Sequence, residues 1–216
     1  LNTAEYFKIP NTGAIAPGYN ADIVVFKDLK KFEPTIVFKK VKLVAKNGKM
    51  TIDMNEFQPP ELRGSVNIKP LKKKDFQIKV PKDKSEIKVI NVIPKQLITK
   101  LSIEKVHSEN GYAISDTDND SLKIAVIERH KASGNIGLGF VKGFGLKKGA
   151  IASTIAHDSH NMIVIGTNDD DMYYAANQLV KSQGGKIIVE NGKTLAQLKL
   201  PNAALMSVEP SEVVMV

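Results

Sequence analysis

A proline- and lysine-rich stretch between Pro59 and Pro81 divides the sequence into two segments of short apolar runs and turns. It holds Pro59-Pro60, Pro70 and the run Lys72-Lys73-Lys74. Prolines and runs of like charge are typical of linkers, although the alternating residues 76–80 also fit an edge strand. For a chain of 216 residues we therefore expect three parts. They are a first domain at residues 1–64, a linker or edge strand at 65–84, and a second domain at 85–216.

The first segment predicts a small β layer. Residues 3–9 carry a short helical pattern that ends before Pro10. Asn47-Gly48 is typical of a two-residue hairpin turn and leads into residues 49–52. Apolar runs of strand length lie at residues 21–26, 34–38 and 41–45. A layer of this size buries too little apolar surface to be stable by itself.

The second segment predicts an α+β domain with a mainly antiparallel sheet and few helices. Its best helical pattern begins after Thr167 or Asn168, carries three aspartates in its first turn and ends at Gly184. A further hairpin is indicated at Asn191-Gly192. Strand patterns lie at residues 122–126, 150–156 and 162–165.

Composition and charge exclude several kinds of chemistry. The chain has no cysteine, which rules out disulfides, thiolate-bound zinc and a cysteine nucleophile and fits a reducing compartment. Its net charge of +8 favours anionic partners without naming one. No apolar run approaches the ~20 residues of a membrane-spanning helix, and no signal peptide is visible at the start. We therefore expect no membrane partner.

The segment from Glu128 to Asn161 is the richest in groups that can carry chemistry. It holds three of the four histidines and six of the fifteen glycines. Such glycine crowding has a backbone cause, such as a positive φ angle or the close approach of another segment. The spacing at Gly134–Gly139 matches neither a dinucleotide-binding nor a P-loop motif. We therefore expect a hairpin or a lid loop here rather than a phosphate cradle.

The polar run from His157 to Asn161 lies between two apolar strands and is the leading candidate site. On a loop held by rigid strands, His157, Asp158, His160 and Asn161 can bind the edge of a heterocycle or shuttle protons. The alternative is a polar turn that caps the strand ends. Two histidines three residues apart could bind a metal, but no third ligand is fixed by the spacing.

Arg129 and His130 form a second candidate group at the end of a strand pattern. They could present hydrogen-bond donors to a substrate. The alternative is that Glu128 and Arg129 are solvated charges that contribute little as a pair.

Phenylalanine and lysine residues alternate at Phe140, Lys142, Phe144, Lys147 and Lys148. Aromatic rings next to cations are used to grip single-stranded nucleic acid. The whole chain has only 6% aromatic residues, and its basic residues are spread along its length. We therefore favour a hairpin with buried phenylalanines, and keep a basic nucleic-acid-binding module as an alternative function.

Two parts of the sequence resemble known enzymes. The runs Asn2–Phe7 and Gly13–Val25 resemble the end of amidohydrolase-superfamily enzymes, where the last barrel helix leads into a small β-sandwich. A second set of motifs resembles the C-terminal domain of microbial adenine deaminases. These motifs are Glu128–His130, Gly134–Gly137, Gly143–Leu146 and Ala152–Asn161.

The resemblance implies a purine-salvage hydrolase that converts adenine to hypoxanthine and ammonia. Such enzymes hold two divalent ions, manganese or iron, at the mouth of a (β/α)8 barrel, where a metal-activated hydroxide attacks C6 of the purine. The metal ligands of that family lie upstream of the position of Leu1, and this sequence has no His-x-His pair. We therefore expect no catalytic residue, metal ligand or bound metal in this chain, which alone is expected to be inactive.

The resemblance also implies that the missing barrel belongs to the same polypeptide, in a cytoplasmic homo-oligomer. Chains of that family usually run beyond the equivalent of Val216, so we expect a fragment at both ends. The loop at residues 157–161 is expected to pack over the barrel mouth, where it would exclude water and orient adenine. A dihydroorotase-like or hydantoinase-like amidohydrolase is the alternative enzyme, because the N-terminal motif is shared.

Overall fold

The structure is a computed structural model that describes residues 2–52, 62–81, 85–209 and 211–214. The chain divides into two compact units, Leu1–Pro59 and Pro60–Val216. Each unit is described by itself.

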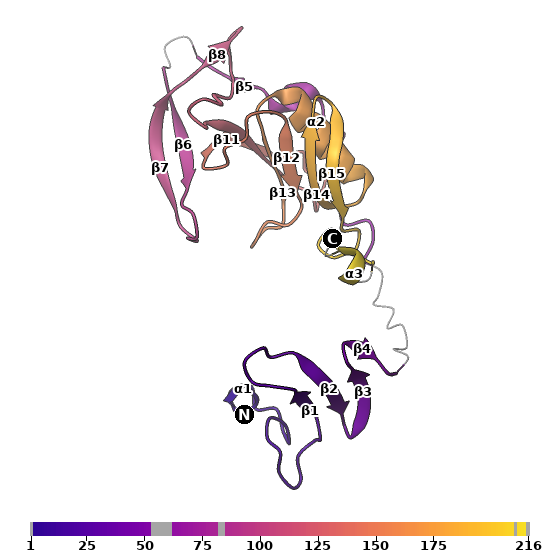
Figure 1. Cartoon of the computed structure of the whole chain (residues 1–216). Helices are drawn as coiled ribbons and strands as arrows, with labels where there is room; N and C mark the ends of the chain where they lie inside the picture. Colours follow the sequence, from indigo (N-terminus) through magenta and orange to yellow (C-terminus); the bar gives the residue numbers. More distant parts are fainter. Residues whose placement is uncertain (1, 53–61, 82–84, 210, 215–216) are drawn as a thin grey trace. The chain divides into compact units, whose positions relative to one another are not determined.

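The first unit is a short helix with one antiparallel sheet of strand order β1-β2-β3-β4 (Figure 1). The helix, α1, spans Asn2–Tyr6, and its expected continuation to residue 9 is prevented by the positive φ of Lys8. Asn47 and Gly48 have φ angles of +49° and +75°, which confirms the predicted hairpin turn. The strands are β1 (Ile23–Phe26), β2 (Pro34–Lys39), β3 (Lys42–Lys46) and β4 (Lys49–Met50).

Almost nothing in the described part of the first unit is buried. Ala4 is its one buried hydrophobic residue, whereas Tyr6, Ile15 and Val41 are each more than three-quarters exposed. A single β layer without a covering layer cannot bury an apolar core. This agrees with the sequence prediction that a β layer of this size is not stable by itself.

The second unit is built on an eight-stranded sheet of order β15-β14-β12-β13-β10-β11-β6-β7. All neighbouring pairs are antiparallel except β6 with β11. Its strands are β6 (Glu86–Val92), β7 (Thr99–Lys105), β10 (Leu122–Ile127), β11 (Ile136–Lys142), β12 (Ala150–Ser153), β13 (Met162–Gly166), β14 (Gly185–Glu190) and β15 (Lys193–Lys199). The structure thus confirms a mainly β fold with few helices, and the described residues form no closed barrel.

Smaller elements complete the second unit. A three-stranded sheet of order β5-β9-β8 packs near β6 and β11. The bounds are η1 (Lys73–Phe76, a 3-10 turn), β5 (Ile78–Lys79), β8 (Ser108–Glu109), β9 (Tyr112–Ala113), α2 (Asp169–Lys181) and α3 (Ser211–Val214).

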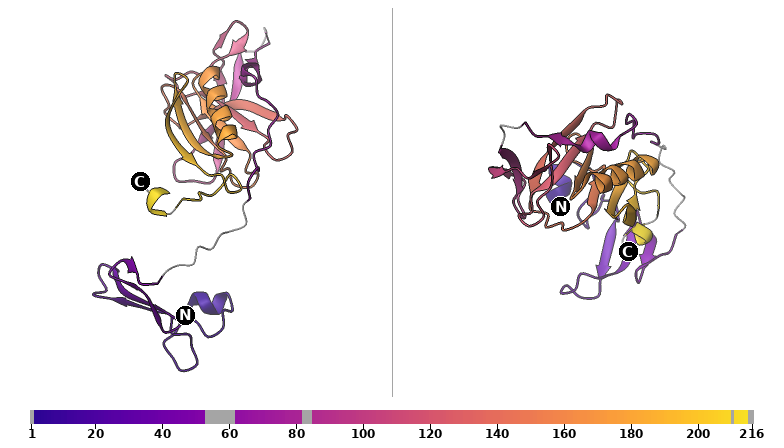
Figure 2. Two further views of the ribbon diagram at one scale, coloured as in Figure 1. Left: turned by 90° about the vertical axis from the view of Figure 1, so that its right-hand side faces the viewer. Right: turned by 90° about the horizontal axis from the view of Figure 1, so that it is seen from above.

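Helix α2 covers one face of the eight-stranded sheet over β12, β13 and β14 (Figure 2). Its N-cap is Asn168, whose side chain accepts a hydrogen bond from the backbone N–H of Asp171. The chain leaves the helix at Gly184, which has a φ of +115°. Both ends agree with the sequence prediction. The buried face of α2 and the sheet form the main core around Met162, Val164, Met172, Ala176 and Leu179.

Residues 65–84, for which the sequence predicts a linker or an edge strand, lie in the second unit where they are described. Val66, Leu71 and Phe76 are buried and belong to the same core as α2. The apolar residues are spaced widely enough that the lysines between them can remain exposed, as Lys72 and Lys74 do. Pro59 and Pro60 lie outside the described residues. The described lysines of this segment lie at the edge of the core, and Ile78–Lys79 form β5, an edge strand of the three-stranded sheet.

Candidate functional site

Arg129 is the most buried of the six candidate residues, with 2% of its surface exposed. Its guanidinium donates hydrogen bonds to three backbone carbonyls: to His160 from Nε, to Ser65 from Nη1 at 2.8 Å and to Ala203 from Nη2 at 3.4 Å. Burial lowers the pKa of Arg129, but an arginine remains charged at neutral pH. Arg129 therefore joins three segments that are far apart in the sequence.

His130 contacts the same loop from the exposed side. Its Nε2 lies 2.9 Å from the backbone carbonyl of Ser159. Because a carbonyl oxygen only accepts, Nε2 carries the proton in this contact. The structure thus brings both second-group residues, Arg129 and His130, against the 157–161 loop that the sequence ranked first.

The 157–161 loop has a constrained backbone. The N–H of His160 donates to the carbonyl of Ala156 at 2.7 Å. Asp158 and His160 have φ angles of +72° and +47°, a left-handed conformation that costs energy for residues other than glycine. These contacts are those of a tight turn, which is compatible with both the site and the polar-turn interpretation.

The side chains of this loop differ in their surroundings. His157 and Asp158 are exposed, whereas His160 and Asn161 are half-buried. The ring centroids of His157 and His160 lie 6.4 Å apart. Nδ1 of His160 is buried, and no hydrogen-bond partner for it exists among the residues that the structure describes.

Glu128 organises the turn that presents His130. Its carboxylate accepts hydrogen bonds from the N–H groups of His130, Lys131 and Ser133 and from the hydroxyl of Ser133. These contacts, the N–H of Ser133 first among them, lower the pKa of Glu128 to about 2. Glu128 is thus an exposed carboxylate that caps the N–H groups of this turn.

We expect Glu128→Gln to loosen this turn, because a single amide oxygen cannot replace two carboxylate oxygens. Since the pKa of Glu128 is lowered on folding, its contribution to stability is present above about pH 4.3, the usual pKa of an unfolded glutamate. This contribution is lost as the pH falls toward 2. Urea unfolding at several pH values should therefore give a wild-type advantage at pH 7 that shrinks steadily below pH 4.3. Asp118→Asn, at an exposed position, is the matched control, and an advantage that is independent of pH would contradict the assignment.

A cavity of about 860 Å³ lies beside the 157–161 loop, on the sheet face opposite α2. His157 lines it together with Phe144, Ile188 and Leu198. The walls are mostly apolar, with isoleucine the commonest residue, and the polar groups that line the cavity include Ser153 and Lys186. His157 is the one candidate residue that lines this cavity among the residues described.

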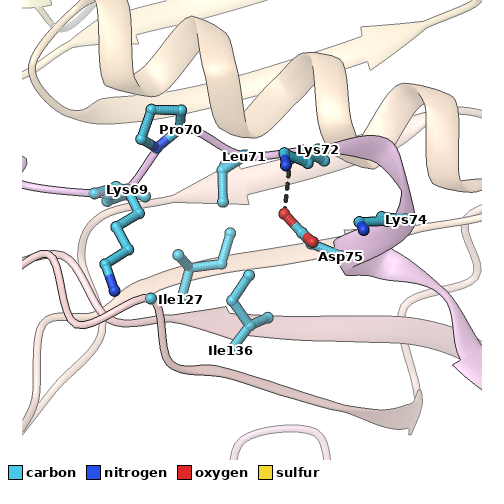
Figure 3. Close-up of a pocket in the computed structure, with 10 residues that line it drawn as sticks. Lys69, Pro70, Leu71, Lys72, Lys74, Asp75, Ile127 and Ile136 are labelled. Atoms are coloured by element: carbon cyan, nitrogen blue, oxygen red, sulfur yellow. Dashed lines mark hydrogen bonds between the residues drawn. The ribbon is translucent and has the colours of Figure 1, made fainter.

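A second cavity, of about 390 Å³, lies on the other side of the sheet. Leu71, Ile127 and Ile136 form its apolar floor, and lysines from the 69–74 segment stand at its rim (Figure 3). Asp75 accepts a hydrogen bond from the N–H of Lys72 there (Figure 3). None of the six candidate residues lines this cavity.

The described residues do not assemble a metal centre. Among the described residues, no group of three or more histidine, aspartate or glutamate side chains is close enough to hold an ion. The pair His157 and His160 offers two imidazoles 6.4 Å apart, and four ligands are typical of a protein metal site of this kind.

The phenylalanine and lysine residues of the nucleic-acid alternative have structural roles. Phe140 is 3% exposed, Lys142 pairs with Glu104 at 2.8 Å, and Nζ of Lys147 donates to the carbonyl of Thr117. Phe144 lines the large cavity. Phe140 is therefore not available to stack on a base. Phe144, however, is 42% exposed, and Lys148 remains largely exposed beside Glu190. The expectation of buried phenylalanines thus holds for Phe140 alone.

Three residues that shape the site were not found from the sequence. Ser65 and Ala203 act through their backbone carbonyls, which leave no pattern in side-chain types. Thr154 is fully buried, and its hydroxyl joins Ala204 and Gly185 just before the loop. A threonine inside an apolar strand is the one sequence feature that could have indicated it.

Within the described residues, no helix has the length and apolar character needed to cross a membrane.

Two protein-family models match this chain. The family model for the adenine deaminase C-terminal domain matches residues 96–216, and the model for the amidohydrolase family matches residues 1–51. These matches cover the two regions whose motifs carry the resemblance.

Similar proteins of known description agree with the family models. An adenine deaminase of Dehalococcoides mccartyi (strain 195) is 47% identical over 212 residues, which cover 98% of this chain and 37% of the relative. An adenine deaminase of Halalkalibacterium halodurans is 45% identical over 216 residues, covering 99% of this chain and 37% of the relative. Adenine deaminase 2 of Carboxydothermus hydrogenoformans is 44% identical over 207 residues, covering 96% and 36%.

The chain thus spans little more than one third of the length of these curated relatives. It belongs to the family defined by the adenine deaminase C-terminal domain.

Proposed function

We propose that this chain is the C-terminal part of an adenine deaminase, which hydrolyses adenine to hypoxanthine and ammonia. The observation that carries the proposal is the alignment of nearly the whole chain with adenine deaminases at 42–47% identity. The order of the two family matches, amidohydrolase before adenine deaminase C-terminal domain, supports it. The shared N-terminal motif alone would equally fit a dihydroorotase-like or hydantoinase-like enzyme.

The catalytic centre of this enzyme would lie in a part of the amidohydrolase domain outside this chain. The first unit supports this, because its described residues are a single β layer with exposed apolar side chains such as Tyr6, Ile15 and Val41. In this proposal the layer is one side of the amidohydrolase β-sandwich. The two divalent ions, manganese or iron, would supply the hydrolytic chemistry when bound elsewhere in the domain. The described residues offer no set of ligands for them.

The same proposal assigns the enzyme to purine salvage in the cytoplasm, as a homo-oligomer. The absence of cysteine from all 216 residues supports a reducing compartment.

We assign the 157–161 loop to the mouth of the active site, where it excludes water and orients adenine. His157 is exposed at the rim of the large cavity, so its imidazole is available to a neighbouring surface. Arg129 and His130 position the loop through its carbonyls at His160 and Ser159. The left-handed φ angles of Asp158 and His160 support a functional conformation, since strain of this kind is retained where a site needs it.

The test is substrate turnover by the full-length protein. Ammonia release from adenine should be faster than hydrolysis of dihydroorotate or hydantoin, and the chain of residues 1–216 alone should release none. Faster turnover of either other substrate would replace adenine deaminase by another amidohydrolase. Salt-dependent binding of oligonucleotides by this chain would favour the nucleic-acid alternative.

The role of the histidines is tested by His157→Asn and His160→Asn in the full-length enzyme. We expect each change to lower kcat/KM for adenine about tenfold, which is roughly 1.4 kcal/mol of transition-state stabilisation. Lys131→Met, at an exposed neighbouring position, should leave kcat/KM unchanged. A loss below about threefold would return the loop to the role of a structural turn.

A further inference from the structure

The eight-stranded sheet has one covered face and one largely open face. The covered face packs against α2, η1 and the three-stranded sheet. On the opposite face, the loop that contains Leu146 covers the area around Leu122, Val141 and Ile165. Val213 and Val214 of α3 line one side of the cavity over β12–β15. A sheet that is apolar on both faces normally lies between two layers.

The pairing register shows how apolar the open face is. Residues paired directly on neighbouring antiparallel strands point to the same side. One such row crosses six strands and contains no polar side chain. It consists of Ala196, Ile188, Ile151, Ile165, Ile124 and Gly139. The adjacent row consists of Leu198, Lys186, Ser153, Ile163, Val126 and Gly137.

Much of this surface is accessible to solvent in this chain. Ile188 is 46% exposed, and Ala196 is also exposed. The cavity of about 860 Å³ lies over β12, β13, β14 and β15 on this face. Exposed apolar side chains on neighbouring strands, beside an apolar cavity, are typical of an interaction surface.

Two glycines on the open face also indicate that another surface packs against it. A Cβ at Gly137 would meet nothing closer than 4.0 Å, and one at Gly139 nothing closer than 3.8 Å. Neither glycine has a positive φ. Packing inside this unit therefore does not require glycine at either position, although glycine weakens a strand. Close approach of a backbone from outside the unit is a reason for glycine at such positions.

We propose that the open face is the docking surface for the part of the amidohydrolase domain that lies outside this chain. The relatives extend over almost three times the matched length, and the amidohydrolase match in this chain stops at residue 51, so a large folded body is available. His157 lines the cavity on this face, so the docking surface is continuous with the candidate site. One interface would thus bury the apolar row through Ile188 and Ile151 and bring His157 to the active-site mouth. The identity of the occupant rests on the proposed function.

The test uses Ile188→Cys in the full-length protein, with Lys181→Cys at the exposed end of α2 as the matched control. The 216 residues contain no cysteine, so labelling by a small maleimide is read against the unchanged full-length protein. We expect position 188 to react at least tenfold more slowly than position 181, at every protein concentration. Equal rates at the two positions would overturn the proposal, because the face would be open in the whole protein.

A photo-crosslinking amino acid at position 188 then identifies the occupant. We expect crosslinks within one polypeptide, mapped by mass spectrometry to residues that precede this chain. Crosslinks between two polypeptides, together with protection that is lost on dilution, would show that a second copy covers the face and would overturn the proposal. Adenine turnover is measured in parallel. Turnover with an unprotected position 188 overturns the docking proposal alone, whereas protection without turnover overturns the proposed activity.

Discussion

Replacing Arg129 by methionine is expected to destabilise the second unit by about 3 kcal/mol, because three partly buried carbonyls lose their donor at once. The carbonyls belong to Ser65, His160 and Ala203. An unpaired buried acceptor costs about 1–3 kcal/mol, and relaxation of the exposed 157–161 loop recovers part of the sum. Methionine keeps most of the apolar volume of arginine, so the loss reports the hydrogen bonds rather than a cavity.

Calorimetry of the chain measures this effect. For a unit of this size, 3 kcal/mol corresponds to a fall in Tm of roughly 10 °C. Arg129→Lys keeps the charge but not the planar fork, so its Tm should lie between those of wild type and Arg129→Met. Lys131→Met, two residues away and exposed, should change Tm by less than about 2 °C. A methionine variant as stable as wild type would mean that the three carbonyls are hydrated and that Arg129 does not hold the loop.

The hydrogen-bond partners of Arg129 could not be predicted from the sequence. The sequence placed it at the end of a strand, in a motif with Glu128 and His130, but left open whether its donors face a substrate or water. Its partners are backbone carbonyls from residues 31, 64 and 74 positions away. Only the fold brings such groups together, because a carbonyl is present at every residue and leaves no pattern.

Local patterns predicted elements where the turn chemistry was specific. The hairpins at Asn47-Gly48 and Asn191-Gly192 and the cap of α2 at Asn168 follow from side chains that favour one backbone conformation. Strands β6 and β7 were not predicted. In β6, Lys88 shares the open face with Ile90, so that face is not consistently polar or apolar. In β7, Leu101 and Ile103 alternate with Lys100, Ser102 and Glu104, a strand pattern that the sequence prediction missed.

The core contribution of residues 65–81 was missed for a related reason. Val66, Leu71 and Phe76 are each buried, but they are separated by prolines and lysines and follow neither a helical nor a strand period. Burial there depends on packing against α2 and the eight-stranded sheet. The composition of this segment correctly predicts that its lysines are exposed, but it does not predict which of its apolar side chains are buried.

Glycine crowding between Glu128 and Asn161 was correctly attributed to backbone geometry, but the sequence could not say which glycine matters most. The structure separates them by what a methyl group would meet. Gly149 has a φ of +78°, and a Cβ there would lie 2.0 Å from the carbonyl oxygen of Val189 in β14. Its carbonyl also accepts the N–H of Thr167. Gly145 has a φ of +64° but no atom within 4 Å of a Cβ.

We expect Gly149→Ala to destabilise the second unit by about 3 kcal/mol. The positive φ costs an alanine about 1 kcal/mol, and moving β14 away from the methyl group adds about 1–3 kcal/mol of packing strain. Val189 and Ala150 are fully buried on either side of this contact, so the strand cannot move without disturbing the core. Urea unfolding measures the change.

Gly145→Ala is the matched control, since it carries the φ cost without the clash and should lose about 1 kcal/mol. Gly139→Ala carries neither cost in this chain, because its φ is not positive and its Cβ meets nothing closer than 3.8 Å. The expected order of destabilisation is therefore Gly149 above Gly145 above Gly139. If Gly149→Ala and Gly145→Ala were equally destabilising, the φ angle alone would account for both glycines. The claim that the close approach of β14 requires glycine at position 149 would then be wrong.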